Sequence, residues 1–589
     1  MGGTFVGSAA ALIQVATHGP IVLRFYDPVA IAQLVMPIGF QVDRLAAVMM
    51  VLVSGVGTLI FRYSIRYMIQ EAGYGRFLAL VGITTSVLLA MVASSNLVML
   101  FVCWQLLSYL LYQLAHNLGH AATRDGAIRT FRLLRAGDAV FLAGILLARC
   151  LYGTTEFSDL FARAISHPVV LSPLPGLHIS GATVVALLVF LGAMGKSAQV
   201  PMHVWLPRSL YAPTPVHALL HAGIINACGF LINRLAPLYG ESPATLHVVF
   251  AVGAVTAILG ATMMLIQNDI KRSLGFSTIG QMGYMVMECG LGAYSLAVFH
   301  LVAHGLFKAY VFLACGNGIH YARQEPALPV GTADRGKTEL RPLVWATGLF
   351  MTLLMPLGLL VAVHGAAGLP PLASQGTIIF LLFSWVASTQ AMFTLVRLRT
   401  ATSWKGEIAM LLALPAVLFT YLVAAARFDT FLYPDSRVSA AYMEAARLPA
   451  PLFDGLIVVA TVVFVMSWTH RFAALRGGAL RTPQAIRTLF ERFYVLLMNQ
   501  MYLDRLVGAM VRWRQPLRVS RTPHPATAGL ALVIHAAAGV IPFAIAAAAL
   551  GTTLGLTQNH ALGVFALAAL WFVGSWMLFD LTHEAMYGT

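Results

Sequence analysis

Two lysines lie where long apolar runs would ordinarily exclude a charge. Lys196 ends the apolar run 181–196, and Lys308 lies inside the run 292–315. A charge at the centre of a bilayer costs at least about 2.5 kcal/mol on insertion scales, so an ionisable residue there indicates function. A buried amine also releases its proton more readily than a guanidinium does. The two lysines therefore predict a proton relay, with a side chain reaching out to the membrane surface as the alternative.

Histidines continue this pattern. His300, His304 and Lys308 are spaced four residues apart, which places them along one stripe of a helix. His217 and His221 repeat the spacing on an earlier run. Because histidine titrates near neutral pH, each set can pass protons. The alternatives are interior histidines with ordinary hydrogen bonds, zinc ligands or haem b ligands.

Acidic residues are scarce in the apolar runs. Asp138 opens a run three residues after Arg135, so it can pair with that arginine or act as the counter-charge of a lysine. Glu288 lies near the end of a short run, where we expect an interfacial position. Lys271 lies in a polar connection between two runs and is a further contributor to consider.

The elements that hold these residues are membrane spans. Hydrophobic residues make up 59 % of the 589 residues and charged residues 10 %, and the mean hydropathy is +0.80. Soluble proteins are about 25 % charged. The composition excludes a soluble enzyme and predicts an all-α polytopic membrane protein with roughly 14–16 transmembrane helices. The apolar runs lie near 42–62, 77–95, 97–115, 137–152, 181–196, 215–233, 244–266, 275–290, 292–315, 343–363, 377–396, 408–425, 454–468, 527–550 and 561–580.

The net charge of +15 is typical of cytoplasmic loops rather than of nucleic-acid binding. Four arginines between 124 and 135 are expected to form one basic connection. The largest basic segment, 471–521, predicts a cytoplasmic loop or an amphipathic helix on the membrane surface or on a partner. No cleavable signal peptide is recognisable, so we expect the spans themselves to direct insertion.

Two of the runs are interrupted at matching places. Gly195 to Pro201 breaks one run, and Gly365 to Pro371 breaks another about 170 residues later. Paired interruptions are typical of inverted-repeat transporters with a site near the membrane midplane. The alternative is that glycine and proline are simply common in membrane helices.

Four motifs carry a family resemblance. They are GKSAQVP at 195–201, WLP at 205–207, APTPVHALLHA at 212–222 and NDIKRSLGFSTIGQMGYM at 268–285. Over roughly 40–400 the chain resembles the antiporter-like, proton-conducting subunits of respiratory complex I and of Mrp antiporters. The resemblance implies two inverted five-helix repeats with broken helices. It makes Lys196 the central broken-helix lysine, His221 the histidine on the next span, and the 300–308 stripe the connecting relay.

Within this superfamily, residues 221–230, 288–294 and 490–508 resemble the DabB branch, the membrane subunits of DAB-type inorganic-carbon transporters. That likeness implies a bacterial cytoplasmic (inner) membrane protein with a large soluble, zinc-dependent, carbonic-anhydrase-like partner of the DabA type. The zinc would lie in the partner, and this chain would hold no cofactor or metal.

Two positions depart from the complex I pattern. Gln105 follows Trp104 where those subunits carry glutamate, and Gln375 stands near the position of a lysine in their second broken helix. Both changes replace a charge by a neutral amide, which argues for a divergent branch. Asp138 is then the group expected to tune Lys196.

The expected function is a proton-conducting subunit that couples the proton gradient to inorganic-carbon uptake and has no bond chemistry of its own. The alternative is an H⁺- or Na⁺-translocating subunit of a complex I-like, hydrogenase-like or Mrp assembly. The expected divisions are an N-terminal segment that spans or lies at the surface (1–40), the conducting core (41–400), additional spans (401–470), the basic segment (471–521) and a C-terminal two-helix hairpin (522–589).

Overall fold

The computed structural model describes residues 1–25, 38–71, 73–115, 121–174, 177–324, 350, 353–362, 365, 374–398, 404–475 and 484–503. The chain forms two compact units. The first comprises Met1–Gly290, Ala297–Ile319 and the chain from Tyr494, and the second comprises Leu291–Leu296 and His320–Phe493. One boundary lies between the end of α12 (Ile270–Gly290) and α13 (Tyr294–Gln324), and the others lie within α13 and within α19 (Gln484–Met498).

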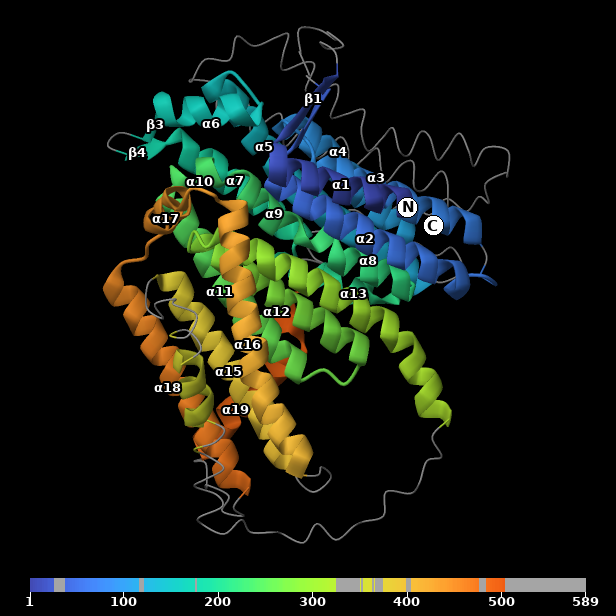
Figure 1. Ribbon diagram of the computed structural model, residues 1–589, viewed down its shortest axis with the longest axis vertical. Helices are drawn as coiled ribbons and strands as arrows, with labels where there is room; N and C mark the ends of the chain where they lie inside the picture. Colours follow the sequence, from blue (N-terminus) through green and yellow to red (C-terminus); the bar gives the residue numbers. More distant parts are fainter. Residues whose placement is uncertain are drawn as a thin grey trace. The chain divides into compact units, whose positions relative to one another are not determined.

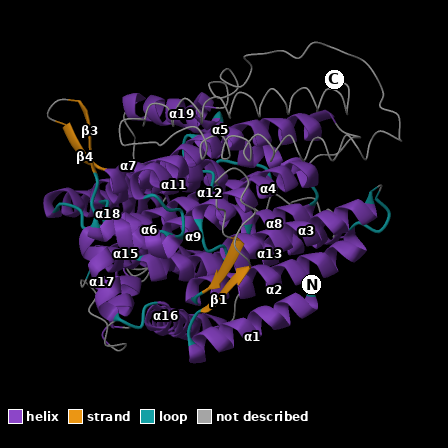
Figure 2. Cartoon of the chain, turned by 90° about the horizontal axis from the view of Figure 1, so that it is seen from above, coloured by secondary structure: helices purple, strands orange, loops and turns teal. Residues whose placement is uncertain are grey.

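The first unit is a bundle of helices with two short hairpins (Figures 1 and 2). Its further helices are α1 (Gly2–His18), α2 (Arg44–Tyr67), α3 (Tyr74–Val92), α4 (Leu97–Ala115), α5 (Ala121–Tyr152), α6 (Phe157–Ser166), α7 (Gly181–Lys196), α8 (Thr214–Ala222), α9 (Ala227–Arg234), α10 (Ala236–Gly240), α11 (Pro243–Leu265) and α12 (Ile270–Gly290). The 3₁₀ segments are η1 (Met202–Tyr211), η2 (Ile224–Asn226) and η3 (Gln500–Tyr502). The hairpins pair β1 (Ile21–Phe25) with β2 (Ile38–Val42) and β3 (Val170–Leu174) with β4 (Leu177–Ser180).

The second unit contains α15 (Gln375–Leu398), α16 (Trp404–Leu432), α17 (Ser436–Ala445) and α18 (Ala450–Leu475). Its described core includes Leu353, Leu360, Trp385 and Trp468. The indole of Trp385 donates a 2.7 Å hydrogen bond to the carbonyl of Leu353. A buried tryptophan therefore fills apolar space and still satisfies its polar edge.

The expected all-α membrane fold is confirmed. Seven described helical stretches are long and apolar enough to cross a membrane, at Arg44–Tyr67, Tyr74–Val92, Leu97–Ala115, Thr214–Arg234, Pro243–Leu265, Tyr294–Ala314 and Ala450–His470. The runs expected at 527–550 and 561–580, and 10 of the 21 residues of 343–363, lie outside the described residues.

One sequence-based expectation about the arginines is wrong. The basic segment 124–135 is not a connection, because α5 runs without interruption from Ala121 to Tyr152. Arg135 lies buried inside the bundle. Charge density alone suggested a loop, but a buried hydrogen-bonding partner allows arginine to continue a helix into the interior.

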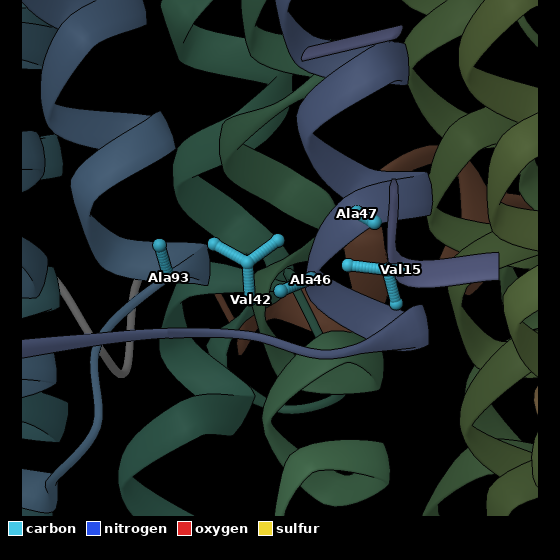
Figure 3. Close-up of a cluster of buried hydrophobic side chains, with 5 residues drawn as sticks. All are labelled: Val15, Val42, Ala46, Ala47 and Ala93. Carbon is cyan, nitrogen blue, oxygen red and sulfur yellow. The ribbon is translucent and has the colours of Figure 1, made fainter. Parts of the chain in front are cut away.

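The N-terminal helix packs against the bundle. Val15 of α1 contacts a cluster formed by Ala46 and Ala47 of α2 together with Val42 and Ala93 (Figure 3). Alanine side chains let the two helix backbones approach closely. Gly19, with φ +92°, and Pro20 then end α1 and lead into β1.

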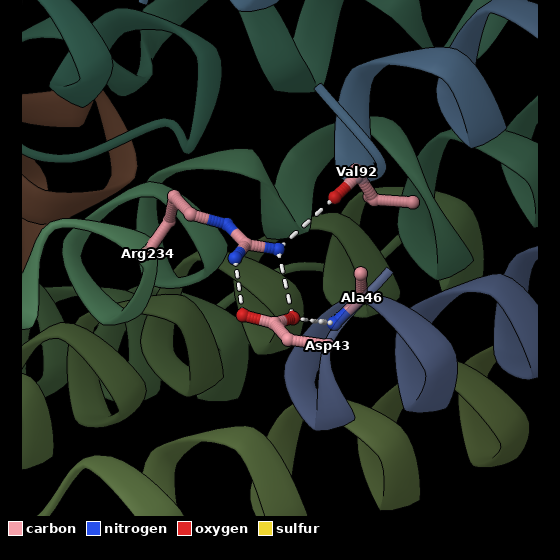
Figure 4. A network of polar contacts seen from close by, with 4 residues as sticks. All are labelled: Asp43, Ala46, Val92 and Arg234. Atoms are coloured by element: carbon pink, nitrogen blue, oxygen red, sulfur yellow. Dashed lines mark hydrogen bonds and ion pairs between the residues drawn. The ribbon is translucent and has the colours of Figure 1, made fainter. Parts of the chain in front are cut away.

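An ion pair ties three helix ends together (Figure 4). Asp43 caps α2 by accepting from the amide of Ala46 at 2.9 Å. Its two oxygens also receive the guanidinium of Arg234 at 2.5 and 3.2 Å, and Arg234 donates to the carbonyl of Val92 at 3.2 Å. A two-point arginine–carboxylate contact fixes geometry as well as energy, so it holds the end of α9 against α2 and α3.

Candidate functional site

Lys196 is buried at the broken end of α7. Its side chain is in the interior at 1 % exposure, and Nζ donates to the carbonyl of Trp104 at 2.6 Å and to Oγ of Ser108 at 2.9 Å. The ammonium also lies 4.3 Å from the centre of the Trp104 ring. The amine therefore faces α4, not the membrane surface.

Asp138 shares both of these partners. One carboxylate oxygen accepts from the indole of Trp104 at 2.9 Å, and the other lies 3.4 Å from Oγ of Ser108. Its charge interacts with Lys196 and with Arg135. We call Trp104, Gln105, Ser108, Arg135, Asp138 and Lys196 the Lys196 cluster. Ser108 and Trp104 bridge an acid and an amine, which is an arrangement that can hold or move one proton.

Gln105 belongs to this cluster through Arg135, whose guanidinium donates to the amide oxygen of Gln105. Both side chains are buried. The neutral amide therefore accepts from an arginine and lies beside the lysine's partners Trp104 and Ser108. In this chain the acid of the cluster comes from α5.

Glycines bring α5 and α7 close enough to form the cluster. A Cβ at Gly137 would lie 2.8 Å from the carbonyl oxygen of Gly192, and one at Gly192 would lie 2.6 Å from the backbone nitrogen of Phe141. Neither position has room for a side chain. Asp138 follows Gly137 and Lys196 ends α7, so this backbone contact sets the separation of acid and amine.

The break after α7 is anchored on the next span. Ser197 donates to the carbonyl of Ile225 and accepts from the amide of Cys228 at 3.1 Å. Trp205 of η1 donates to the carbonyl of Gly195 at 2.7 Å. The polar backbone freed by the break is thus satisfied inside the protein, as a membrane interior requires.

The two histidines of α8 are fully buried. His221 stacks on Phe312 of α13 with ring centres 4.4 Å apart and planes 5° apart. One ring nitrogen of His217 lies 3.1 Å from the carbonyl of Ala212, whereas neither ring nitrogen of His221 has a partner in the described protein. Phe312 lies on the same helix as His304 and Lys308, so His221 packs against the helix that carries them.

The stripe on α13, formed by His300, His304 and Lys308, is buried along its length. One ring nitrogen of His300 lies 3.0 Å from a carboxylate oxygen of Glu288 and the other lies 2.9 Å from the amide oxygen of Gln281. Lys308, at 1 % exposure, donates to the carbonyl of Leu274 at 3.3 Å. We call these three residues the α13 stripe.

The expectation for Glu288 is corrected by this contact. Glu288 is 2 % exposed and paired with His300, so it is not interfacial. The short run at 275–290 placed it near a span end, but α13 covers that end. Ser108 and Gln281 were not singled out from the sequence, because an uncharged polar side chain in a helix gives no signal of its own.

Two expected contributors lie elsewhere. Lys271, in the first turn of α12, is half-buried, and within the described residues no hydrogen bond joins it to the Lys196 cluster or the α13 stripe. In the second unit, the amide of Gln375 donates to the carbonyl of Leu448 at 3.0 Å and accepts from its amide at 2.9 Å. This side chain is held by backbone on both polar atoms.

Comparison with protein families gives two matches. The family described as NADH:quinone oxidoreductase/Mrp antiporter, TM, matches residues 94–427. The family described as NADH-ubiquinone oxidoreductase (complex I), chain 5 N-terminus, matches residues 29–78. The first match covers more than half of the chain and includes both groups of buried residues.

Among curated proteins, the chain is 38 % identical over 480 residues to a probable inorganic carbon transporter subunit DabB1 of Halothiobacillus neapolitanus, covering 80 % of this chain and 84 % of the relative. It is 40 % identical over 289 residues to NADH-quinone oxidoreductase subunit L of Neisseria meningitidis, covering 48 % of this chain and 43 % of that protein. The chain thus spans less than half the length of this second relative.

Two solved structures share the fold. A subunit of an archaeal membrane-bound sulfane sulfur reductase matches with a TM-score of 0.53 at 18 % identity, covering 75 % of this chain and 92 % of that one. A subunit of respiratory complex I from Thermus thermophilus matches with a TM-score of 0.51 at 21 % identity, covering 76 % and 94 %.

Proposed function

The chain belongs to the NADH:quinone oxidoreductase/Mrp antiporter family of proton-conducting, multi-pass membrane subunits, and from that premise we propose that it serves inorganic-carbon uptake. In this proposal it is the proton-conducting subunit of a complex in a bacterial cytoplasmic membrane. The similarity to a probable inorganic carbon transporter subunit over 80 % of the chain supports this choice within the family.

The proton path is proposed to use the two buried lysines as its charge-changing groups. The single observation that carries this proposal is the shared contact of Lys196 and Asp138 with Ser108 and Trp104. His221 and the α13 stripe supply the next titratable groups. The ring nitrogens of His221 and His304 have no hydrogen-bond partner among the described residues, so they can bind water on such a path. Asp138 takes the role of counter-charge that a glutamate at position 105 would have.

The chemistry of carbon hydration is assigned to a partner. We propose a large soluble, zinc-dependent, carbonic-anhydrase-like subunit of the DabA type, with the zinc in that subunit. This chain would supply energy through proton flow and form no covalent intermediate. The proposed direction of coupling is from proton entry to CO₂ hydration or bicarbonate accumulation in the partner.

Growth at low CO₂ tests the proposal directly. Lys196→Ala and Lys196→Arg should both abolish growth that depends on the complex, because alanine removes the charge and arginine does not release a proton. Arg272→Ala, which changes an exposed basic residue, is the matched control and should grow normally. Normal growth of Lys196→Ala, with the protein present in the membrane, would refute the assignment.

A second function has its own support. The match to an NADH-quinone oxidoreductase subunit at 40 % identity over 289 residues favours an H⁺- or Na⁺-translocating subunit of a complex I-like or Mrp assembly. Co-purification decides between the two. Iron–sulfur or quinone-binding subunits would support this second function, and a zinc-containing soluble subunit would support carbon uptake. An absorption spectrum of the same preparation tests for haem b.

A further inference from the structure

A groove of about 940 Å³ runs between α2 and α13 on the first unit. Its volume is at the upper end of the roughly 300–1,000 Å³ typical of ligand sites. Its residues come from the C-terminal half of α2 and from the part of α13 that follows His304. Neither the Lys196 cluster nor the α13 stripe lines it, so it is separate from the proposed proton path.

One part of this groove is basic and aromatic. Arg62 and Arg66 lie one turn apart and are exposed, close to the end of a candidate span at Tyr67. Tyr63 and Tyr67 stack beside them with ring centres 5.4 Å apart. Arginine and tyrosine at a span end are the side chains that meet lipid headgroups.

The remainder of the groove is apolar. Leu59 and Val56 line it from α2, and Leu306, Leu313 and Ala314 line it from α13. Leu59 and Leu306 are more than half exposed within this chain. The groove therefore joins a cationic end to a hydrocarbon-lined wall along the axis of a membrane span.

We propose that this groove binds one anionic phospholipid, with its phosphate on Arg62 and Arg66 and an acyl chain along Leu59, Leu306 and Leu313. Charge complementarity selects the occupant, because two adjacent guanidinium groups prefer a phosphate carrying a net negative charge. A basic pocket between membrane helices is the usual form of such a site.

The groove touches elements that carry the relay. The hydroxyl of Tyr67 lies 3.2 Å from Oγ1 of Thr214, the first residue of α8, and α8 carries His217 and His221. The opposite wall is α13, where Lys308 lies between the lining residues Leu306 and Ala309. A bound lipid would therefore contact α13 directly and α8 through Tyr67, without touching the titratable groups themselves.

Titration of phosphatidylglycerol into the delipidated full-length chain tests this site, with retention measured by native mass spectrometry. The parent should retain one phosphatidylglycerol and should not retain phosphatidylcholine. Arg62→Gln with Arg66→Gln should weaken retention about tenfold or more, the effect of two basic residues at a headgroup. Arg272→Gln with Arg437→Gln removes the same charge at exposed positions outside the groove and should retain the lipid like the parent.

A second variant examines the apolar wall. Ala314 is exposed and lines the groove, so Ala314→Trp should fill the acyl-chain space and weaken retention while both arginines remain. Full retention by either groove variant would overturn the proposal, as would equal loss in the control pair or equal retention of phosphatidylcholine. Failure of the parent to bind added phosphatidylglycerol would do the same, since it would mean that another segment or protein covers the groove. None of these outcomes depends on whether the chain serves carbon uptake.

Discussion

Lys196 and Lys308 are both buried amines on apolar helices, but their surroundings differ. Lys196 donates to a carbonyl and a hydroxyl and shares that hydroxyl with Asp138. Among the described residues neither lysine makes a direct ion pair, but Lys308 donates to the carbonyl of Leu274 and shares no hydrogen-bond partner there with an acid. Glu288 of α12 is the acid nearest the α13 stripe along the chain, and it is paired with His300, at the opposite end of the stripe from Lys308.

Because of this difference, we expect the two lysines to have different roles in proton transfer. A protonated amine whose hydrogen-bond partners also contact an acid is stabilised by that acid, whereas an amine bonded to a carbonyl lacks this stabilisation. We therefore expect Lys196 to be the site where charge is stored and Lys308 to be the site through which it passes. The predictions below test that contrast, from the largest expected effect to the smallest.

Removing the acid of the Lys196 cluster should have the largest effect. Asp138→Asn keeps the shape of the side chain but leaves the ammonium of Lys196 without its counter-charge. Because Asp138 reaches Lys196 through Ser108 and Trp104, we expect proton flux to fall about a hundredfold, which corresponds to about 2.7 kcal/mol at about 1.4 kcal/mol per factor of ten. Proton uptake by proteoliposomes measures this. Flux within twofold of the parent would show that Asp138 is not the counter-charge.

Separating α5 from α7 should damage the same cluster through packing. Gly192→Ala places a Cβ 2.6 Å from the backbone nitrogen of Phe141, and overpacking of this kind costs about 1–3 kcal/mol. We expect a lower thermal unfolding midpoint and reduced flux. Gly358→Ala is the matched control, because a Cβ there meets no atom of the described residues within 4 Å. Equal stability of the two variants would contradict the close contact.

Removing the charge of Glu288, which is paired with His300 of the α13 stripe, should have a smaller effect on proton flux. Glu288→Gln can still hydrogen bond to His300 but loses its charge, while the hydrogen bonds of Lys196 and Lys308 stay in place. We expect flux to fall about tenfold, less than for Asp138→Asn. The two variants should be compared in the same vesicles. A larger loss for Glu288→Gln would reverse the proposed roles of the two sites.

Replacing Gln375 should lower only the stability of the fold and leave the proton flux unchanged. Gln375→Ala removes two hydrogen bonds to the backbone of Leu448, which together are worth about 1–2 kcal/mol. Flux per folded molecule should match that of the parent, since both polar atoms of the side chain are held by backbone. The unfolding midpoint and the flux are measured on one preparation. A loss of flux without a loss of stability would return Gln375 to the relay.

The α13 stripe shows which features the local sequence pattern can predict and which it cannot. His300, His304 and Lys308 share one helical face because their spacing follows the 3.6-residue period, and the helix is required by the apolar residues around them. Their burial was therefore predictable. The pairing of His300 with Glu288 was not, because the turn between α12 and α13 decides which residues of the two helices meet.

The amino-acid sequence by itself determined that this is a membrane protein and that Lys196, His221 and the α13 stripe lie in its spans, because the cost of charge in hydrocarbon applies to each residue separately. Only the tertiary structure decided that Lys196 meets Ser108 and Asp138, and that Arg62 and Arg66 border a groove. Lys196 and its partner Ser108 are 88 residues apart in the chain. The approach of Asp138 to this pair depends on how closely α5 and α7 pack, and that distance is set by Gly137 and Gly192 against the neighbouring backbone rather than by the pattern along either helix.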